Sequence, residues 1–90
     1  MTMLSREVQI TNIRGLHARA SAKFVTLASA HSAEVEVEKD GSKVAGTSIM
    51  GLMMLGAAKG DSVTISASGD GAAKALAALV ELVEGKFGEE

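Results

Sequence analysis

The chain has 90 residues, enough for a single domain over residues 1–90 with a modest core, and it contains no cysteine, which excludes disulfides and thiolate metal sites. Its net charge of −2 and its two aromatic residues argue against nucleic-acid binding, which ordinarily uses a basic face and stacking aromatics. The most apolar stretch, residues 49–58, is too short to cross a bilayer, and the first residues lack the apolar run of a signal peptide. We therefore expect a cytoplasmic protein without membrane insertion, a compartment that also suits a chain without cysteine.

The first third of the chain predicts a strand, a loop and a helix. Residues 7–11 alternate polar and apolar side chains, which is typical of a half-buried strand. Residues 12–15 interrupt this alternation and are expected to form a loop. From Ala18 the apolar residues recur with helical spacing, and we expect this helix to end near residues 31–32. Its buried face would consist of Ala20, Phe24, Leu27 and Ala28.

The middle of the chain predicts a hairpin followed by a short helix. Residues 33–38 alternate again, with three glutamates on the side that faces water. The dipeptide Asp40-Gly41 is a strong signal for a two-residue turn, and residues 42–45 form the expected return strand. Thr47-Ser48 then opens an apolar helix over about residues 49–55.

The last third predicts one strand and one helix, and it completes the expected fold class. Residues 62–68 show the clearest alternation in the chain, and glycines in residues 69–71 indicate a turn into the final helix. Each strand has one polar face, so the order β-α-β-β-α-β-α predicts an α+β fold: a four-stranded antiparallel sheet covered on one face by three helices. The apolar stripe of the final helix would consist of Ala72, Leu76, Leu79, Val80, Val83 and Phe87.

The segment Gly15-Leu16-His17-Ala18-Arg19 lies where the predicted loop becomes a helix. The first N–H groups of a helix lack intrahelical partners and carry the positive end of its dipole, so they can cradle a phosphate. A histidine placed there could carry a phosphoryl group close to these N–H groups and to Arg19. An isolated histidine near a helix start can equally be an ordinary surface residue, so the spacing alone leaves both interpretations open.

Two segments carry a resemblance to a known family: residues 15–25, GLHARASAKFV, and residues 47–69, TSIMGLMMLGAAKGDSVTISASG. They resemble the HPr family of phosphocarrier proteins, which serve the bacterial phosphoenolpyruvate-dependent phosphotransferase system. The resemblance runs from about Val8 to the last helix, and the family's fold is an open-faced β-sandwich with the element order predicted above. It implies a phosphoryl carrier rather than an enzyme with a substrate of its own, and it implies no cofactor.

The resemblance also implies roles for the residues around the start of the first helix. His17 matches the histidine that the family phosphorylates on Nδ1, and Arg19 matches the arginine that steadies the phosphoryl group. The backbone at Gly15 and Ala18 is expected to cradle that group. Enzyme I, charged from phosphoenolpyruvate, is the implied donor, and a IIA-type component is the implied acceptor. The family often has proline where this chain has Ala20; alanine is a good helix former, so we expect a slightly less rigid helix start and no loss of function.

Ser48 has a structural and a regulatory interpretation. Serine is a favoured N-cap, and Ser48 lies where a helix is predicted to begin. The resemblance implies that HPr kinase/phosphorylase phosphorylates this serine in many bacteria, and a phosphate at a helix N-terminus is compatible with the fold. On the same helix, Met50 and Leu52 are expected to contact partner proteins, with core packing as the alternative.

Two other functions stay open at this stage. The first is a regulatory HPr-like binding module that acts through Ser48 and protein contacts; relatives of that kind lack the active histidine, so His17 argues against it. The second is a small hydrolase or transferase, which needs a deep pocket and an acid/base pair; no carboxylate lies near His17 in the sequence, and Asp61 and Asp70 could approach it only through the fold. No metal site is expected, because no close ligand spacing joins His17 and His31. We expect a monomer, and the sequence leaves open whether the relay serves sugar uptake or the nitrogen-related branch.

Overall fold

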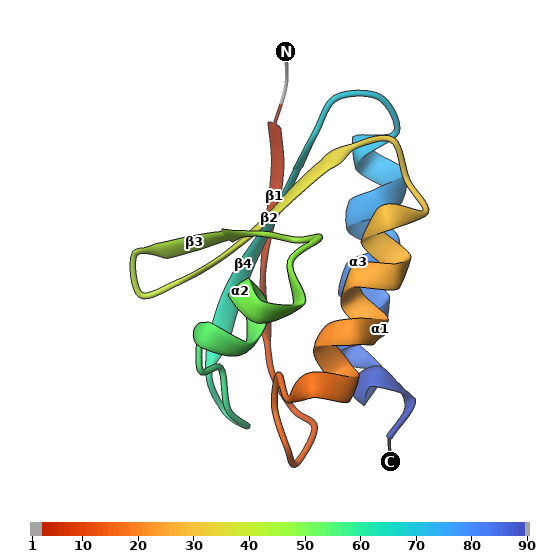
Figure 1. The fold of residues 1–90 in the computed structure, drawn as a ribbon. Helices are drawn as coiled ribbons and strands as arrows, with labels where there is room; N and C mark the ends of the chain where they lie inside the picture. The colour runs from red at the N-terminus through yellow and green to blue at the C-terminus, as the bar shows by residue number, and fades with distance from the viewer. Residues whose placement is uncertain (1–2, 90) are drawn as a thin grey trace.

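A four-stranded sheet and the helices packed on one of its faces make up the computed structural model, which describes residues 3–89 (Figure 1). Within these residues no helix has the length and apolar character needed to cross a membrane. The elements in chain order are β1 (Met3–Gln9), α1 (Ala18–Ser29), β2 (Glu34–Lys39), β3 (Ser42–Ala45), α2 (Ile49–Met54), β4 (Ser62–Ser68), α3 (Ala72–Glu84) and the short 3₁₀ helix η1 (Lys86–Gly88).

The sheet is antiparallel throughout, with the strand order β1-β4-β2-β3. The last strand in the chain, β4, therefore lies in the middle, where Ile65 pairs with Val37 of β2 and with Arg6 of β1. The hairpin between β2 and β3 turns at Asp40 and Gly41, whose positive φ angles of 50° and 85° are those that a tight two-residue turn needs. The predicted α+β class, with helices on one face of the sheet, is confirmed.

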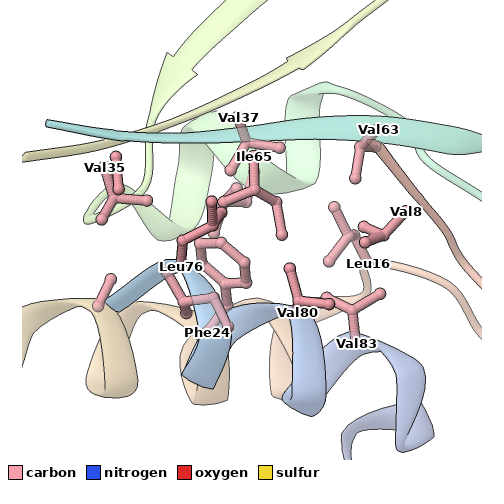
Figure 2. Packing of buried hydrophobic residues seen from close by; sticks show 14 of the residues in the cluster. Val8, Leu16, Phe24, Val35, Val37, Val63, Ile65, Leu76, Val80 and Val83 are labelled. Atoms are coloured by element: carbon pink, nitrogen blue, oxygen red, sulfur yellow. The ribbon is translucent and has the colours of Figure 1, made fainter. Parts of the chain in front are cut away.

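The hydrophobic core lies between the sheet and the two long helices (Figure 2). In β4 the buried residues Val63, Ile65 and Ala67 alternate with partly exposed ones, as the sequence pattern predicts. The ring of Phe24 rises from α1 toward the sheet and belongs to the same buried cluster as Leu76 of α3 (Figure 2). Burial of one such apolar side chain contributes about 1.5–3 kcal/mol, so the apolar face of α1 fixes the helix against the sheet.

Two predicted boundaries shift at the start of the chain. The first strand spans β1 rather than residues 7–11, because its pairing with β4 extends back to Met3 opposite Ser68. It ends at Gln9 because the backbone of Ile10 bonds to the 60–61 loop instead of a strand. The helix α1 ends at Ser29 rather than near residues 31–32, because the N–H groups of the next two residues bond three residues back in a tightened last turn.

Phe87 is buried, but it does not belong to the final helix as its spacing predicts. The helix α3 ends at Glu84, and Lys86 and Phe87 both have positive φ angles, 58° and 56°. This reversal sends the chain back toward α1, where Lys23 Nζ donates a 2.7 Å hydrogen bond to the carbonyl oxygen of Phe87. Figure 1 shows the resulting C-terminal segment beside the first turns of α1.

Candidate functional site

His17 is the N-cap of α1, at the boundary that the sequence predicts. Its ring Nδ1 accepts a hydrogen bond from the backbone N–H of Arg19, with 3.3 Å between the two nitrogens. An acceptor at this position satisfies one of the N–H groups that have no partner inside the helix. The Nδ1 lone pair therefore faces the positive end of the helix. Ala18 and Arg19 are the first two helical residues and are exposed, whereas Ala20, the residue in place of the family's proline, is buried.

The loop that leads to His17 is held by a close approach at Gly15. This residue has a φ angle of +61°, and a Cβ added there would lie 2.4 Å from the carbonyl oxygen of Ala57 and 2.9 Å from Cα of Ala58. The next residue, Leu16, donates its N–H to the same Ala57 oxygen at 3.0 Å. Only glycine combines this backbone angle with this packing distance. The loop before His17 is thus fixed against the segment that follows α2.

A carboxylate that the sequence did not suggest lies against the other ring nitrogen of His17. Glu89 Oε2 is 2.5 Å from His17 Nε2, and Glu89 Oε1 accepts a 3.1 Å hydrogen bond from Asn12 Nδ2. The side chains of His17 and Glu89 are only 18% and 15% exposed, so the contact is shielded from water. No spacing pattern could reveal it, because 72 residues separate the pair and the fold alone joins them.

The surroundings of Glu89 favour its charged form. Partial burial by itself would raise the pKa of the Glu89 carboxyl. Hydrogen bonds from Asn12 and His17 and the nearby positive charge of Lys23 outweigh that effect, so the pKa of Glu89 lies below its ordinary value of 4.5. A negative charge is therefore held beside the His17 ring at neutral pH.

An open hollow of about 400 Å³ borders this histidine. Three cationic side chains line it, from Arg14, Arg19 and Lys23. Among residues 3–89 no carboxylate forms an ion pair with the Arg19 guanidinium. The hollow is thus positively charged around His17, with Arg19 available to an incoming anion.

Ser48 is the N-cap of α2, as predicted. Its Oγ accepts a 3.0 Å hydrogen bond from the backbone N–H of Gly51, and its carbonyl oxygen accepts one from the N–H of Leu52. The side chain is partly exposed. The hydroxyl therefore serves the helix as an acceptor while remaining reachable from solvent.

The helix α2 presents methionines to solvent and buries Leu52. Met50 and Met54 are 68% and 79% exposed, and Ile49 and Met53 are partly covered. Leu52 is 0% exposed, which contradicts the expectation that it contacts partners. The short helix is apolar all round, so its sequence did not show which side faces the core. The exposed face, made of Ile49, Met50, Met53 and Met54, is called the α2 patch below.

The remaining chemical candidates lie elsewhere. Asp61 accepts a hydrogen bond from the backbone N–H of Ala58, and Asp70 lies in the turn before α3, so neither borders the hollow at His17. His31 lies beyond the far end of α1. Across residues 3–89 no cluster of three or more histidine or acidic side chains is arranged to hold a metal ion.

Comparison with known proteins places these features in a family. The family model described as the PTS HPr component phosphorylation site matches residues 4–85. The phosphocarrier protein HPr of Neisseria meningitidis serogroup A is 51% identical over 87 residues, which cover 97% of this chain and 98% of that protein. The phosphocarrier protein NPr of Shewanella violacea is 42% identical over 89 residues, which cover 99% of this chain and 98% of that protein.

The solved structures agree with the sequence relatives. The crystal structure of HPr-C-His from Thermoanaerobacter tengcongensis matches with a TM-score of 0.90 and 49% identity, covering 100% of this chain and 99% of that one. The HPr structure from Bacillus anthracis matches with a TM-score of 0.88 and 40% identity, over 92% of this chain and 99% of that one. The resemblance drawn from the two sequence segments is confirmed, and the chain belongs to the HPr family of phosphocarrier proteins of the phosphotransferase system.

Proposed function

We propose that His17 accepts a phosphoryl group on Nδ1 from phospho-Enzyme I and passes it to a IIA-type component. The observation that most supports this is the orientation of the ring. Nδ1 accepts a hydrogen bond from the backbone N–H of Arg19, so this nitrogen carries a lone pair rather than a proton. It also lies at the positive end of α1. A nucleophilic nitrogen at a helix start is well placed to carry a dianionic group.

The transfer needs positioning and charge stabilisation more than covalent help from the carrier. The Nδ1 lone pair attacks phosphorus in line with the departing ring nitrogen of the donor. The new P–N bond forms as the old one breaks, and the bonding pair of the old bond stays on the donor nitrogen. The same steps in reverse deliver the group to an acceptor. A site at the surface suits this exchange, because two different proteins must reach it in turn.

Three parts of the site would stabilise the transferred group. The guanidinium of Arg19 has no carboxylate partner among residues 3–89 and can pair with the phosphoryl oxygens. The N–H groups of the first turn, beginning at Ala18, point toward it. Gly15 fixes the loop that leads to His17 by its close approach to Ala57 and Ala58, and so holds this cradle in position.

The test is incubation of the protein with Enzyme I and phosphoenolpyruvate, followed by intact mass measurement and mapping of the modified residue. We expect one acid-labile phosphoryl group on His17. His17→Ala should abolish acceptance, whereas the matched control His31→Ala should accept normally because His31 lies beyond the other end of α1. Acceptance by His17→Ala, or none by the wild-type chain with an active Enzyme I, would overturn the proposal. Arg19→Ala should slow transfer without abolishing it.

We also propose that Ser48 is a regulatory phosphorylation site for HPr kinase/phosphorylase. Its hydroxyl is partly exposed at the start of α2, directly before the exposed methionines of the α2 patch. A phosphate there would place nearly two negative charges beside an apolar docking surface and weaken the uptake from Enzyme I. Incubation with that kinase and ATP should modify wild-type protein and not Ser48→Ala. Ser48→Asp should remain folded and raise the KM for Enzyme I; an unchanged KM would leave Ser48 as a helix cap only.

A further inference from the structure

The carboxylate of Glu89 lies in direct contact with the ring nitrogen that does not take the phosphoryl group. From this placement we infer that Glu89 is a positioning residue: it holds the His17 ring in the tautomer that carries its proton on Nε2, and it balances the positive charge that the ring acquires when Nδ1 is phosphorylated. The claim about charge balance rests on the proposed carrier function. The claim about the tautomer concerns the unmodified protein alone.

The two ring nitrogens have partners of opposite kind. Nδ1 faces an N–H donor, the backbone of Arg19 at 3.3 Å, and can only accept there. Nε2 faces an acceptor, the Glu89 carboxylate at 2.5 Å, and makes its best hydrogen bond by donating. A neutral imidazole has one N–H and one lone pair, so these two contacts together select the Nε2–H tautomer. This leaves the lone pair on Nδ1, where the proposed chemistry needs it.

The charge balance of the transfer gives the carboxylate its second role. The neutral ring donates the Nδ1 lone pair to phosphorus and keeps its proton on Nε2, so the ring becomes a phosphoimidazolium with one positive charge. The donor ring retains the electron pair of the broken P–N bond. No proton has to leave His17 at any point, and delivery to the acceptor restores the neutral ring. A shielded carboxylate on Nε2–H stabilises the cationic ring in the way that a buried aspartate orients and stabilises a catalytic histidine.

Contacts with Asn12 and with α1 hold the Glu89 carboxylate in place. Glu89 Oε1 is fixed by Asn12 Nδ2, and the same Nδ2 group donates to the carbonyl oxygen of Gly15 at 2.9 Å. Asn12 is itself fully buried. Two residues before Glu89, the buried ring of Phe87 anchors the chain in the core. The carbonyl oxygen of Phe87 also accepts a hydrogen bond from Lys23 Nζ. Glu89 is thus tied both to the core and to the loop before His17.

Apart from Glu89, the charged side chains of residues 3–89 that line the hollow beside the ring are cationic. Arg14 from the loop and Arg19 and Lys23 from α1 line the hollow beside His17. Each of them disfavours a positive charge on the ring, because like charges repel. Glu89 is the one carboxylate among the residues that line this hollow. It therefore opposes the repulsion that the ring would meet from these cations when Nδ1 is phosphorylated.

The experiment compares the wild-type chain with Glu89→Ala, Glu89→Asp and the matched control Glu84→Gln. Glu84 is an exposed carboxylate at the end of α3, so its removal changes the net charge without touching the His17 ring. Ring ¹⁵N chemical shifts report the tautomer of His17 in the protein alone, and amide spectra report that each variant is folded. Enzyme I and phosphoenolpyruvate then give kcat and KM for phosphoryl acceptance.

We expect the Nε2–H tautomer in the wild-type chain and in Glu84→Gln, and a mixture of tautomers in Glu89→Ala. Phosphoryl acceptance by Glu89→Ala should fall about tenfold in kcat, which is the scale of one lost charge-assisted hydrogen bond. Glu89→Asp should recover part of both effects. Unchanged tautomers and rates in Glu89→Ala would overturn the inference, and so would a rise in KM alone, which would make Glu89 a docking contact. If Enzyme I fails to charge the wild-type chain, the carrier function fails, while the tautomer measurement still decides whether Glu89 positions the ring.

Discussion

Replacement of Gly15 by alanine tests whether the loop before His17 is fixed by its close approach to residues 57–58. Gly15 has a φ angle of +61°, and a new Cβ would lie 2.4 Å from the backbone oxygen of Ala57. The matched control is Gly56→Ala, because Gly56 has a similar φ angle of +65° and nothing within 4 Å of an added Cβ. The two variants share the backbone strain and differ in the steric clash.

The expected losses follow from these two contributions. A left-handed backbone conformation costs a non-glycine residue about 1 kcal/mol, which is the whole loss expected for Gly56→Ala. In Gly15→Ala the clash is with backbone, so the loop has to shift, at a further cost of about 1–3 kcal/mol that includes the hydrogen bond from Leu16 to Ala57. We expect Gly15→Ala to be less stable than Gly56→Ala by about 2 kcal/mol. For a domain of this size that gap is about 8–16 °C in Tm.

Thermal and urea unfolding followed by far-UV circular dichroism measure this gap, since the chain has no tryptophan or tyrosine for fluorescence. Gly15→Ala should also accept phosphoryl groups more slowly, because a shifted loop displaces His17 two residues later. Equal losses of stability in the two variants would refute the reasoning, because the contact with Ala57 would then contribute nothing.

Three further predictions concern the core, the α2 cap and the C-terminal carboxylate. Phe24→Ala should lower the free energy of unfolding by about 3–5 kcal/mol, seen as a lower urea midpoint, because the ring is buried in the core between the sheet and the helices. Ser48→Ala should cost about 1 kcal/mol in the same assay, whereas Ser48→Asp should cost little because aspartate caps a helix equally well. Glu89→Gln should be less stable than wild type at about pH 7, and the difference should shrink progressively as the pH is lowered below the ordinary value of 4.5. The sign follows from the lowered pKa of Glu89: its stabilisation is complete above its ordinary value of 4.5 and is lost as the pH falls through the folded-state value. A difference that persists in acid would mean that the charge of Glu89 is not what stabilises the fold.

The sequence predicts those parts of the fold that depend on local patterns. The strand β4 has the predicted limits because its alternation matches the pairing on both sides. The start of α1 at His17 is predictable because the period of the apolar residues changes there, and the start of α2 at Ser48 is predictable because serine is a favoured N-cap. The sequence pattern fails to predict the limits of an element where strand pairing or a reversal of the backbone determines them. The strand β1 begins earlier because β4 supplies partners for Met3 onward, and Phe87 leaves the helix because two residues adopt positive φ angles.

The sequence identifies only part of the candidate site, because a local pattern cannot show contacts that the fold makes between distant residues. His17 and Arg19 are two residues apart, so one motif contains both. Glu89 comes from the opposite end of the chain, and the reversal after α3 brings it to the ring. For Leu52 the core-packing alternative holds rather than the partner contact, and the sequence could not decide between them because a six-residue helix without polar side chains does not show which face is buried.

The strand order has a consequence for how the molecule is made. Because β4 lies in the middle of the sheet but is the last strand in the chain, β1 has no partner strand until β4 is synthesised: pairing can begin at Ser62 and is complete only at Ser68. Before then, only the hairpin of β2 and β3 can form sheet hydrogen bonds. Such distant pairing makes folding slower than in a helical protein of the same length. The contact between His17 and Glu89 joins residues that are 72 positions apart, so a nascent chain can complete this site only after Glu89 has been synthesised.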